Sequence, residues 1–172
     1  MLQIEEIQAY LANSAYSADL ALFPGTQVPY LVLGKAAGQL PKTNAEPAPT
    51  LSPVGSLVFV NDILASIGQP ISAIDQLQMT LTLDLTVPET RVRELSHVLA
   101  AINQRLDLGN MGLNGQNVLY YRYHWQVFER QISKTRLENA LDLAYQQVSK
   151  YQPRLQALAA GEMQLHQALN FS

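Results

Sequence analysis

The sequence predicts an α+β fold: a single domain whose sheet has about five mainly antiparallel strands and is covered on one face by helices. Residues 77–87 alternate apolar and polar side chains without a break, so this strand buries one face and exposes the other. Two long amphipathic segments, on either side of an Asn-Gly turn signal, supply helices for the buried face. The length allows one well-buried core, and the expected order within residues 1–172 is α-β-β-β-α-β-β-α.

The first half of the chain favours one helix and two strands. Residues 2–13 place an apolar stripe opposite glutamates, which indicates a helix too short to persist without docking on the sheet or on a partner. Residues 28–33 and 56–60 are typical of strands, and residues 62–67 favour a helical turn. Residues 36–55 contain four prolines and little apolar surface, so we expect a flexible loop there.

The middle of the chain predicts a strand, a helix and a hairpin in succession. The strand at 77–87 runs into Pro88, which at the first helical position begins a helix with an apolar stripe from Val92 to Leu106 and an end near residue 108. Asn114 and Gly115 then separate two strand-forming segments, and this dipeptide favours a type I′ turn with positive φ at both central residues. A β-hairpin therefore completes the predicted sheet.

The last part of the chain predicts one long helix. Ser133 is its expected N-cap and Gly161 its expected end, while Pro153 should kink or interrupt it. Its apolar residues recur at alternating spacings of four and three, which suits packing on a sheet and also a coiled-coil partner. This stripe consists of Leu137, Leu141, Ala144, Val148, Tyr151, Leu155 and Leu158.

Composition excludes several classes of function. The chain has no cysteine, which removes disulfide scaffolds, thiolate metal sites and cysteine nucleophiles. The formal net charge is −3, with −6 in residues 1–90 and +3 in residues 91–172, and this balance argues against general nucleic-acid binding. No signal peptide and no apolar run of membrane-spanning length is present, so we expect a cytoplasmic protein that binds neither nucleic acid nor membrane.

The sequence contains no assembled catalytic or metal-binding motif. Phosphate-loop, dinucleotide-binding and nucleophile-elbow patterns are absent. The histidines His97, His124 and His166 are far apart in the sequence, and each has an ordinary role in packing or on the surface. We therefore expect a non-enzymatic protein with no catalytic residue, no cofactor and no bound metal.

The most distinctive stretch is the aromatic and polar strand near residues 118–125. Its period of two places Tyr121 on the buried face, and Tyr120, Arg122 and His124 on the opposite face. Arg122 either pairs with a carboxylate such as Asp84 or belongs to a recognition surface, because tyrosine and arginine are enriched at binding hot spots. Both interpretations stay open. The candidate binding surface comprises Thr80, Thr82, Asp84, Tyr120, Arg122 and His124.

Two segments around the predicted turn, residues 108–113 and 118–123, resemble the hairpin of the YbjN family. The helix end at residues 102–106 and the later segment 151–155 are similar to that family in order and spacing, so the resemblance covers residues 77–161. It implies a fold like that of the type III secretion chaperones. It also implies a bacterial binding or regulatory protein that is often dimeric and has no known catalytic residue.

Two functions follow as hypotheses. The leading one is a non-enzymatic, chaperone-like or regulatory homodimer that holds a segment of another protein on an exposed sheet or helix surface. The alternative is a small-molecule sensor or enzyme with a pocket near residues 118–125, beneath the proline-rich loop. In that case Tyr120, Arg122 and His124 would hold an anionic ligand.

Overall fold

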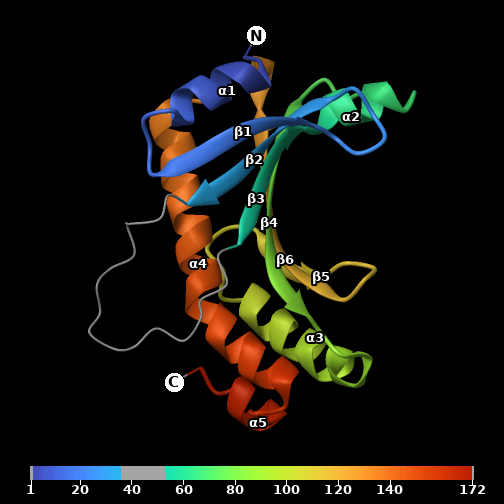
Figure 1. Cartoon of the computed structure of the whole chain (residues 1–172), viewed down its shortest axis with the longest axis vertical. Helices are drawn as coiled ribbons and strands as arrows, with labels where there is room; N and C mark the ends of the chain where they lie inside the picture. Colours follow the sequence, from blue (N-terminus) through green and yellow to red (C-terminus); the bar gives the residue numbers. More distant parts are fainter. Residues whose placement is uncertain (1, 36–52, 172) are drawn as a thin grey trace.

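The computed structural model describes residues 2–35 and 53–171, and these form a curved, six-stranded antiparallel sheet with helices packed along one face (Figure 1). The strand order is β1-β2-β3-β4-β6-β5. The predicted α+β class is confirmed, with six strands where about five were expected. The strands are β1 (Tyr16–Leu22), β2 (Pro29–Lys35), β3 (Val54–Phe59), β4 (Asp75–Thr86), β5 (Asn110–Leu113) and β6 (Val118–Val127).

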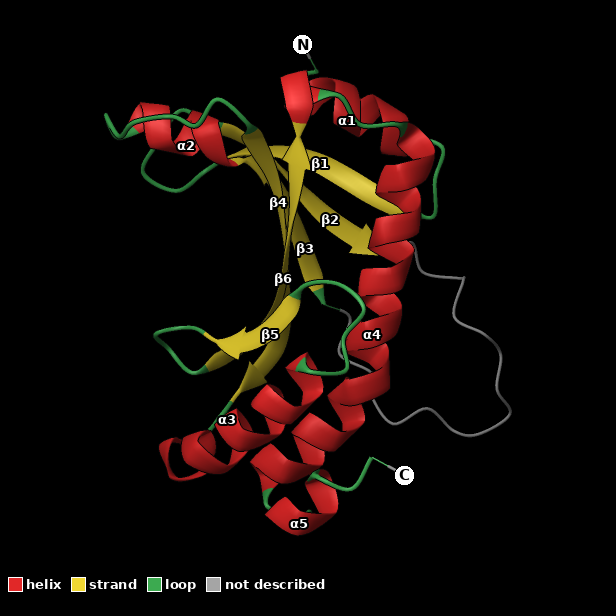
Figure 2. Ribbon diagram, turned by 180° about the vertical axis from the view of Figure 1, so that it is seen from behind, coloured by secondary structure: helices red, strands yellow, loops and turns green. Residues whose placement is uncertain are grey.

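The two faces of the sheet differ in the helices that cover them. Helices α1, α3 and α4 contribute to the core on one face, called here the inner face, whereas α2 projects on the side away from α4 (Figure 2). None of the described helices is long and apolar enough to cross a membrane. The helices are α1 (Ile4–Leu11), α2 (Val60–Ser66), α3 (Glu89–Asn103), α4 (Lys134–Ala160) and α5 (Leu165–Ala168), with a 3₁₀ turn η1 (Phe128–Arg130) before α4.

The core lies between the inner face of the sheet and helix α4. Strand β4 alternates as predicted, and Leu77, Met79 and Leu81 are completely buried. Every member of the predicted apolar stripe of α4 is buried within this chain, so the core-packing interpretation holds and the stripe is not free for a coiled-coil partner. Burial of each large apolar side chain contributes about 1.5–3 kcal/mol, which makes this contact the main support of the fold.

Strand β1 was not predicted, because its sequence lacks the alternation of an ordinary half-buried strand. It pairs with β2 at the edge of the sheet, with Tyr16 opposite Lys35 and Leu22 opposite Pro29. Tyr16 is buried under α4, but Leu22 remains exposed beyond the helical cover. An edge strand buries only part of its inner face, so its periodicity is weak.

The structure corrects two local predictions around helix α3. Pro88 is the N-cap rather than the first helical residue, and the helix ends at Asn103 rather than near residue 108. Asn103, the last residue of α3, binds the edge strand β5 through its side chain. The side-chain amide donates to the carbonyl of Met111 at 2.9 Å, and the side-chain oxygen accepts the Met111 N–H at 2.7 Å. These bonds fasten β5 to the end of α3.

The hairpin between β5 and β6 is confirmed, but its turn is not type I′. The connection spans residues 114–117, and positive φ occurs at Asn117 (58°) instead of at Asn114 and Gly115. The Asn114 side-chain oxygen accepts the backbone N–H groups of Gln116 and Val118, at 2.9 and 3.0 Å. This side chain stabilises the longer turn by taking the place of a backbone acceptor.

Helix α4 is continuous through Pro153, so the predicted interruption is wrong. Its N-cap at Ser133 and its left-handed end at Gly161 (φ 79°) are as predicted. The expected flexible loop at residues 36–55 lies mostly outside the described residues, and its last two residues, Val54 and Gly55, belong to strand β3.

Candidate functional site

The outer face of the sheet brings most of the predicted site residues together. Thr80 and Thr82 of β4 lie directly opposite Arg122 and Tyr120 of β6. Asp84 has no paired residue on β6, because the pairing between β4 and β6 shifts between Thr82 and Thr86. Among the described residues Asp84 forms no ion pair, so the predicted pair between Arg122 and Asp84 is wrong.

A short row of hydrogen bonds crosses from β6 to β4 on this face. The Nε2 of His124 lies 2.9 Å from the side-chain oxygen of Gln78, and the amide nitrogen of Gln78 donates to the hydroxyl of Thr80 at 3.3 Å. Partial burial and the nearby positive charge of Arg122 lower the pKa of His124 below its usual value. The histidine is therefore held mainly in its neutral form, as a hydrogen-bonding group rather than a charge.

Among the described residues, Arg122 forms no ion pair with a carboxylate. Its guanidinium lies 4.7 Å from the centre of the Tyr120 ring, and its Nε is buried without a hydrogen-bond partner. The Tyr120 ring in turn lies over Gly112 of β5, where an added Cβ would approach the tyrosine hydroxyl to 2.7 Å. Glycine at this position keeps Tyr120 flat against the sheet, which supports the guanidinium above it.

An apolar hollow of about 310 Å³ lies on the same face, toward β2 and β3. Thr82 belongs both to its wall and to the predicted surface, so the hollow adjoins the Arg122 region. Sequence reasoning missed this hollow, because its residues come from a turn and three strands. Its wall consists of Phe23, Pro24, Tyr30, Val32, Val54, Gly55, Ser56 and Thr82.

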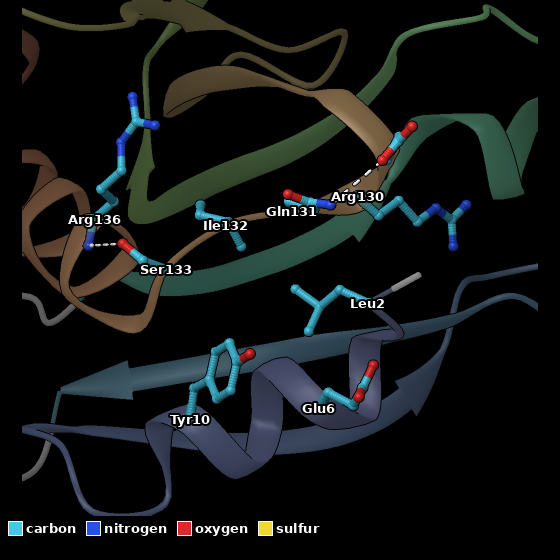
Figure 3. Close-up of a pocket in the computed structure, with 9 residues that line it drawn as sticks. Leu2, Glu6, Tyr10, Arg130, Gln131, Ile132, Ser133 and Arg136 are labelled. Carbon is cyan, nitrogen blue, oxygen red and sulfur yellow. Dashed lines mark hydrogen bonds between the residues drawn. The ribbon is translucent and has the colours of Figure 1, made fainter.

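A second, larger groove of about 830 Å³ separates α1 from the segment that leads into α4. In Figure 3, Glu6 and Tyr10 of α1 lie on one side of this groove and Ile132 lies on the other. The Glu6 carboxylate accepts the Gln3 N–H at 2.7 Å and thus caps its own helix. The groove has polar walls, but the hydrogen bond of Glu6 serves its own helix.

Arg130 points away from this groove, toward α2 (Figure 3). Its guanidinium forms ion pairs with Asp62 and, at 2.6 Å, with Asp75, and it lies 4.2 Å from the centre of the Phe59 ring. Burial opposes the charged form, but the hydrogen bonds to both carboxylates prevail and raise the pKa of Arg130. These contacts join β3, α2, β4 and η1, and therefore position one end of the sheet.

The described residues that could bind a metal ion lie apart from one another. Within residues 2–35 and 53–171, no three histidine, aspartate or glutamate side chains gather closely enough to hold a metal ion. Of the three histidines, only His124 lies on the candidate surface, since His97 belongs to α3 and His166 to α5.

Comparison with known proteins gives one family. The profile of the YbjN family, whose description reads "Putative bacterial sensory transduction regulator", matches residues 64–157. This region runs from α2 into α4 and includes β4 and β6, which carry all six residues of the predicted surface. No curated protein sequence matches the chain.

Proposed function

Because this chain belongs to the YbjN family of bacterial regulators, we propose that it acts by binding a segment of another protein on the outer face of its sheet. The observation that carries this proposal is Arg122, which has no carboxylate partner among the described residues, on the same sheet face as an apolar hollow that α1, α3 and α4 leave uncovered. Such a surface suits a peptide with one acidic and one apolar side chain.

The geometry of the sheet sets the spacing expected between the acidic and the apolar side chain of the bound peptide. Arg122 lies on β6, and the hollow lies two to three strands away on β3 and β2. Neighbouring strands are about 4.8 Å apart, which gives a separation of about 10–15 Å. An extended peptide advances about 3.3 Å per residue, so its acidic and apolar residues should be about three to five positions apart.

Fluorescence anisotropy with labelled peptides tests this proposal. The peptides carry one glutamate and one phenylalanine at varied separations, and binding should be strongest near the predicted spacing. Arg122→Gln should weaken binding about tenfold, because a hydrogen bond to a charged group contributes about 1.5–3 kcal/mol. Arg93→Gln, which removes an exposed charge from α3, is the matched control. Equal binding by both variants, or no dependence on spacing, would contradict the proposal.

A small anionic ligand at Arg122 is the second candidate, favoured by the buried, unpartnered Nε of this residue. A ligand at a hundred times its dissociation constant adds about 2.7 kcal/mol to the free energy of unfolding. A thermal-shift screen of anionic metabolites should then show stabilisation that Arg122→Gln abolishes. If no metabolite stabilises the native protein, this candidate is eliminated.

We also propose that the protein is a homodimer, with α2 and the loop after it as the contact between copies. Residues 65–74 are all exposed, and residues 63–74 carry no charge. Within this segment, Ile67 and Ile71 are 58% and 62% exposed. An uncharged patch can meet its own copy without repulsion, as a twofold contact requires.

Size-exclusion chromatography with light scattering measures the mass of the native protein. Ile71→Asp should convert a dimer to a monomer, whereas the control Leu169→Asp, at an exposed position after α5, should not. A native monomer at micromolar concentration would exclude this contact. The lack of enzymatic activity and the cytoplasmic location expected from the sequence stay predictions.

A further inference from the structure

Three cationic side chains meet at the end of the molecule where α3, α4 and α5 converge (Figure 1). They line a hollow of about 290 Å³. Arg105 follows α3, while Lys150 and Arg154 are one turn apart on α4. Two aromatic residues, Tyr151 of α4 and Phe171 after α5, complete the wall. This hollow contains no residue of the outer face, so the inference below is independent of the function proposed above.

Phe171 holds two of these cations in place. The guanidinium carbons of Arg105 and Arg154 lie 4.4 and 4.5 Å from the centre of its ring. The Phe171 ring itself packs edge to face against Tyr151, with ring centres 6.2 Å apart. Two positive charges are therefore fixed beside one ring before any ligand arrives, which reduces the entropy lost on binding.

The positive charge in this hollow is not neutralised by the described residues. The ion pairs among them involve Arg91, Arg130 and Lys134, and none involves Arg105, Lys150 or Arg154. The two arginines donate instead to backbone carbonyls, Arg105 to Ala101 at 2.9 Å and Arg154 to Ala168 at 3.1 Å. Each guanidinium has five N–H donors, so several remain for a ligand.

We propose that this hollow binds the phosphate or diphosphate group of a small metabolite. Three like charges in one hollow repel one another, and a bound anion with two or more charges removes this repulsion. Phosphate oxygens match the forked donors of arginine better than a single acceptor does. Guanidinium groups already occupy the Phe171 ring, so the ligand is recognised by its charge and oxygen atoms and not by stacking of a base.

Isothermal titration calorimetry on the full chain tests the proposal with three probes: inorganic phosphate, pyrophosphate and ADP. We expect saturable binding that is tighter for pyrophosphate than for phosphate and that weakens with added salt. Similar affinities for ADP and pyrophosphate would identify the diphosphate as the recognised group. Tighter binding of ADP would still support a phosphate site but would contradict recognition by charge and oxygen atoms alone.

Arg105→Gln and Lys150→Gln should each weaken pyrophosphate binding about tenfold, since each removes one charge-assisted contact. Both residues are exposed, so the variants should fold, which circular dichroism checks. Arg93→Gln removes one exposed charge from α3 outside the hollow and should leave the affinity unchanged.

Three results would overturn the proposal. The first is no saturable binding of any probe at millimolar concentration. The second is an equal loss of affinity in Arg93→Gln and in the hollow variants, since this would mean general attraction to positive charge. The third is binding of an acidic peptide that depends on Arg105 and Lys150 while all three phosphate probes fail, which would make the hollow a protein contact.

Discussion

Arg130 offers the sharpest test of how the fold is held together. Its side chain stabilises the folded state, whereas its backbone conformation destabilises it. Its guanidinium joins Asp75 and Asp62, but its φ is 53° and that of Glu129 is 49°, both in the left-handed region that favours glycine. Replacement by alanine removes the side-chain contacts and keeps the strained backbone. Replacement by glycine removes both.

The structure gives the expected magnitudes. Breaking a buried ion pair costs about 3–5 kcal/mol, and the lower end applies because Asp75 still accepts the N–H groups of Asn61 and Gln76. The Phe59 contact adds about 1 kcal/mol. Asp62 is 35% exposed, so solvent screening keeps its pair with Arg130 below about 1 kcal/mol. We expect Arg130→Ala to lower the free energy of unfolding by about 4 kcal/mol, and Arg130→Gly by about 1 kcal/mol less.

Urea denaturation followed by circular dichroism measures both variants. A cost below about 1 kcal/mol for Arg130→Ala would refute the buried-pair reasoning. Greater stability of alanine over glycine would refute the assignment of backbone strain. The double variant Asp75→Asn with Arg130→Ala should be more stable than the sum of the single losses, because it no longer buries an unpaired carboxylate.

Three further predictions concern single residues. The pKa of His124, measured by NMR titration, should lie below 6.5 and should rise in Arg122→Gln. Because the pKa is lowered in the folded state, the neutral ring contributes its full stability above pH 6.5. That stability is lost as the pH falls from 6.5 through the folded-state pKa. An unchanged midpoint in the variant would rule out the influence of Arg122. Gly109→Ala should lower the melting temperature far more than Gly25→Ala: both have positive φ, but an added Cβ at residue 109 lies 2.5 Å from the Arg122 carbonyl, while nothing lies within 4 Å at residue 25. Equal melting temperatures would disprove this clash. Tyr16→Phe should cost about 1 kcal/mol in urea denaturation through loss of the hydroxyl that donates to Asp142, and no cost would mean that water replaces the bond fully.

Much of the fold could be predicted from local patterns. The alternation in β4 and the apolar stripe of α4 indicate which side of each element is buried. Both patterns can be seen in residues that are close together in the sequence. The parity of β6 was also correct, since Leu119 and Tyr121 are completely buried. Edge strand β1 escaped prediction because an edge needs little burial, and Pro153 did not interrupt α4 because the packing of the helix on both sides outweighs one lost hydrogen bond.

The site residues were only partly predictable. Period two correctly placed Thr80, Thr82, Tyr120, Arg122 and His124 on one face, but a shift in strand register leaves Asp84 without a paired residue on β6. A shift of this kind leaves no signal in the sequence. The cluster around Arg130 and the hollow lined by Arg105, Lys150 and Arg154 escaped for another reason, because their members come from distant segments and only the tertiary fold brings them together.

The proline inside α4 has a mechanical consequence. The helix is 27 residues long, about 40 Å at 1.5 Å per residue, and it runs between the two ends of the molecule. Pro153 has no N–H to donate to the carbonyl of Ser149, so helix α4 bends most easily in that turn. Lys150 and Arg154 lie on either side of Pro153, so any bend in this turn would change the spacing of the two cations that line the hollow.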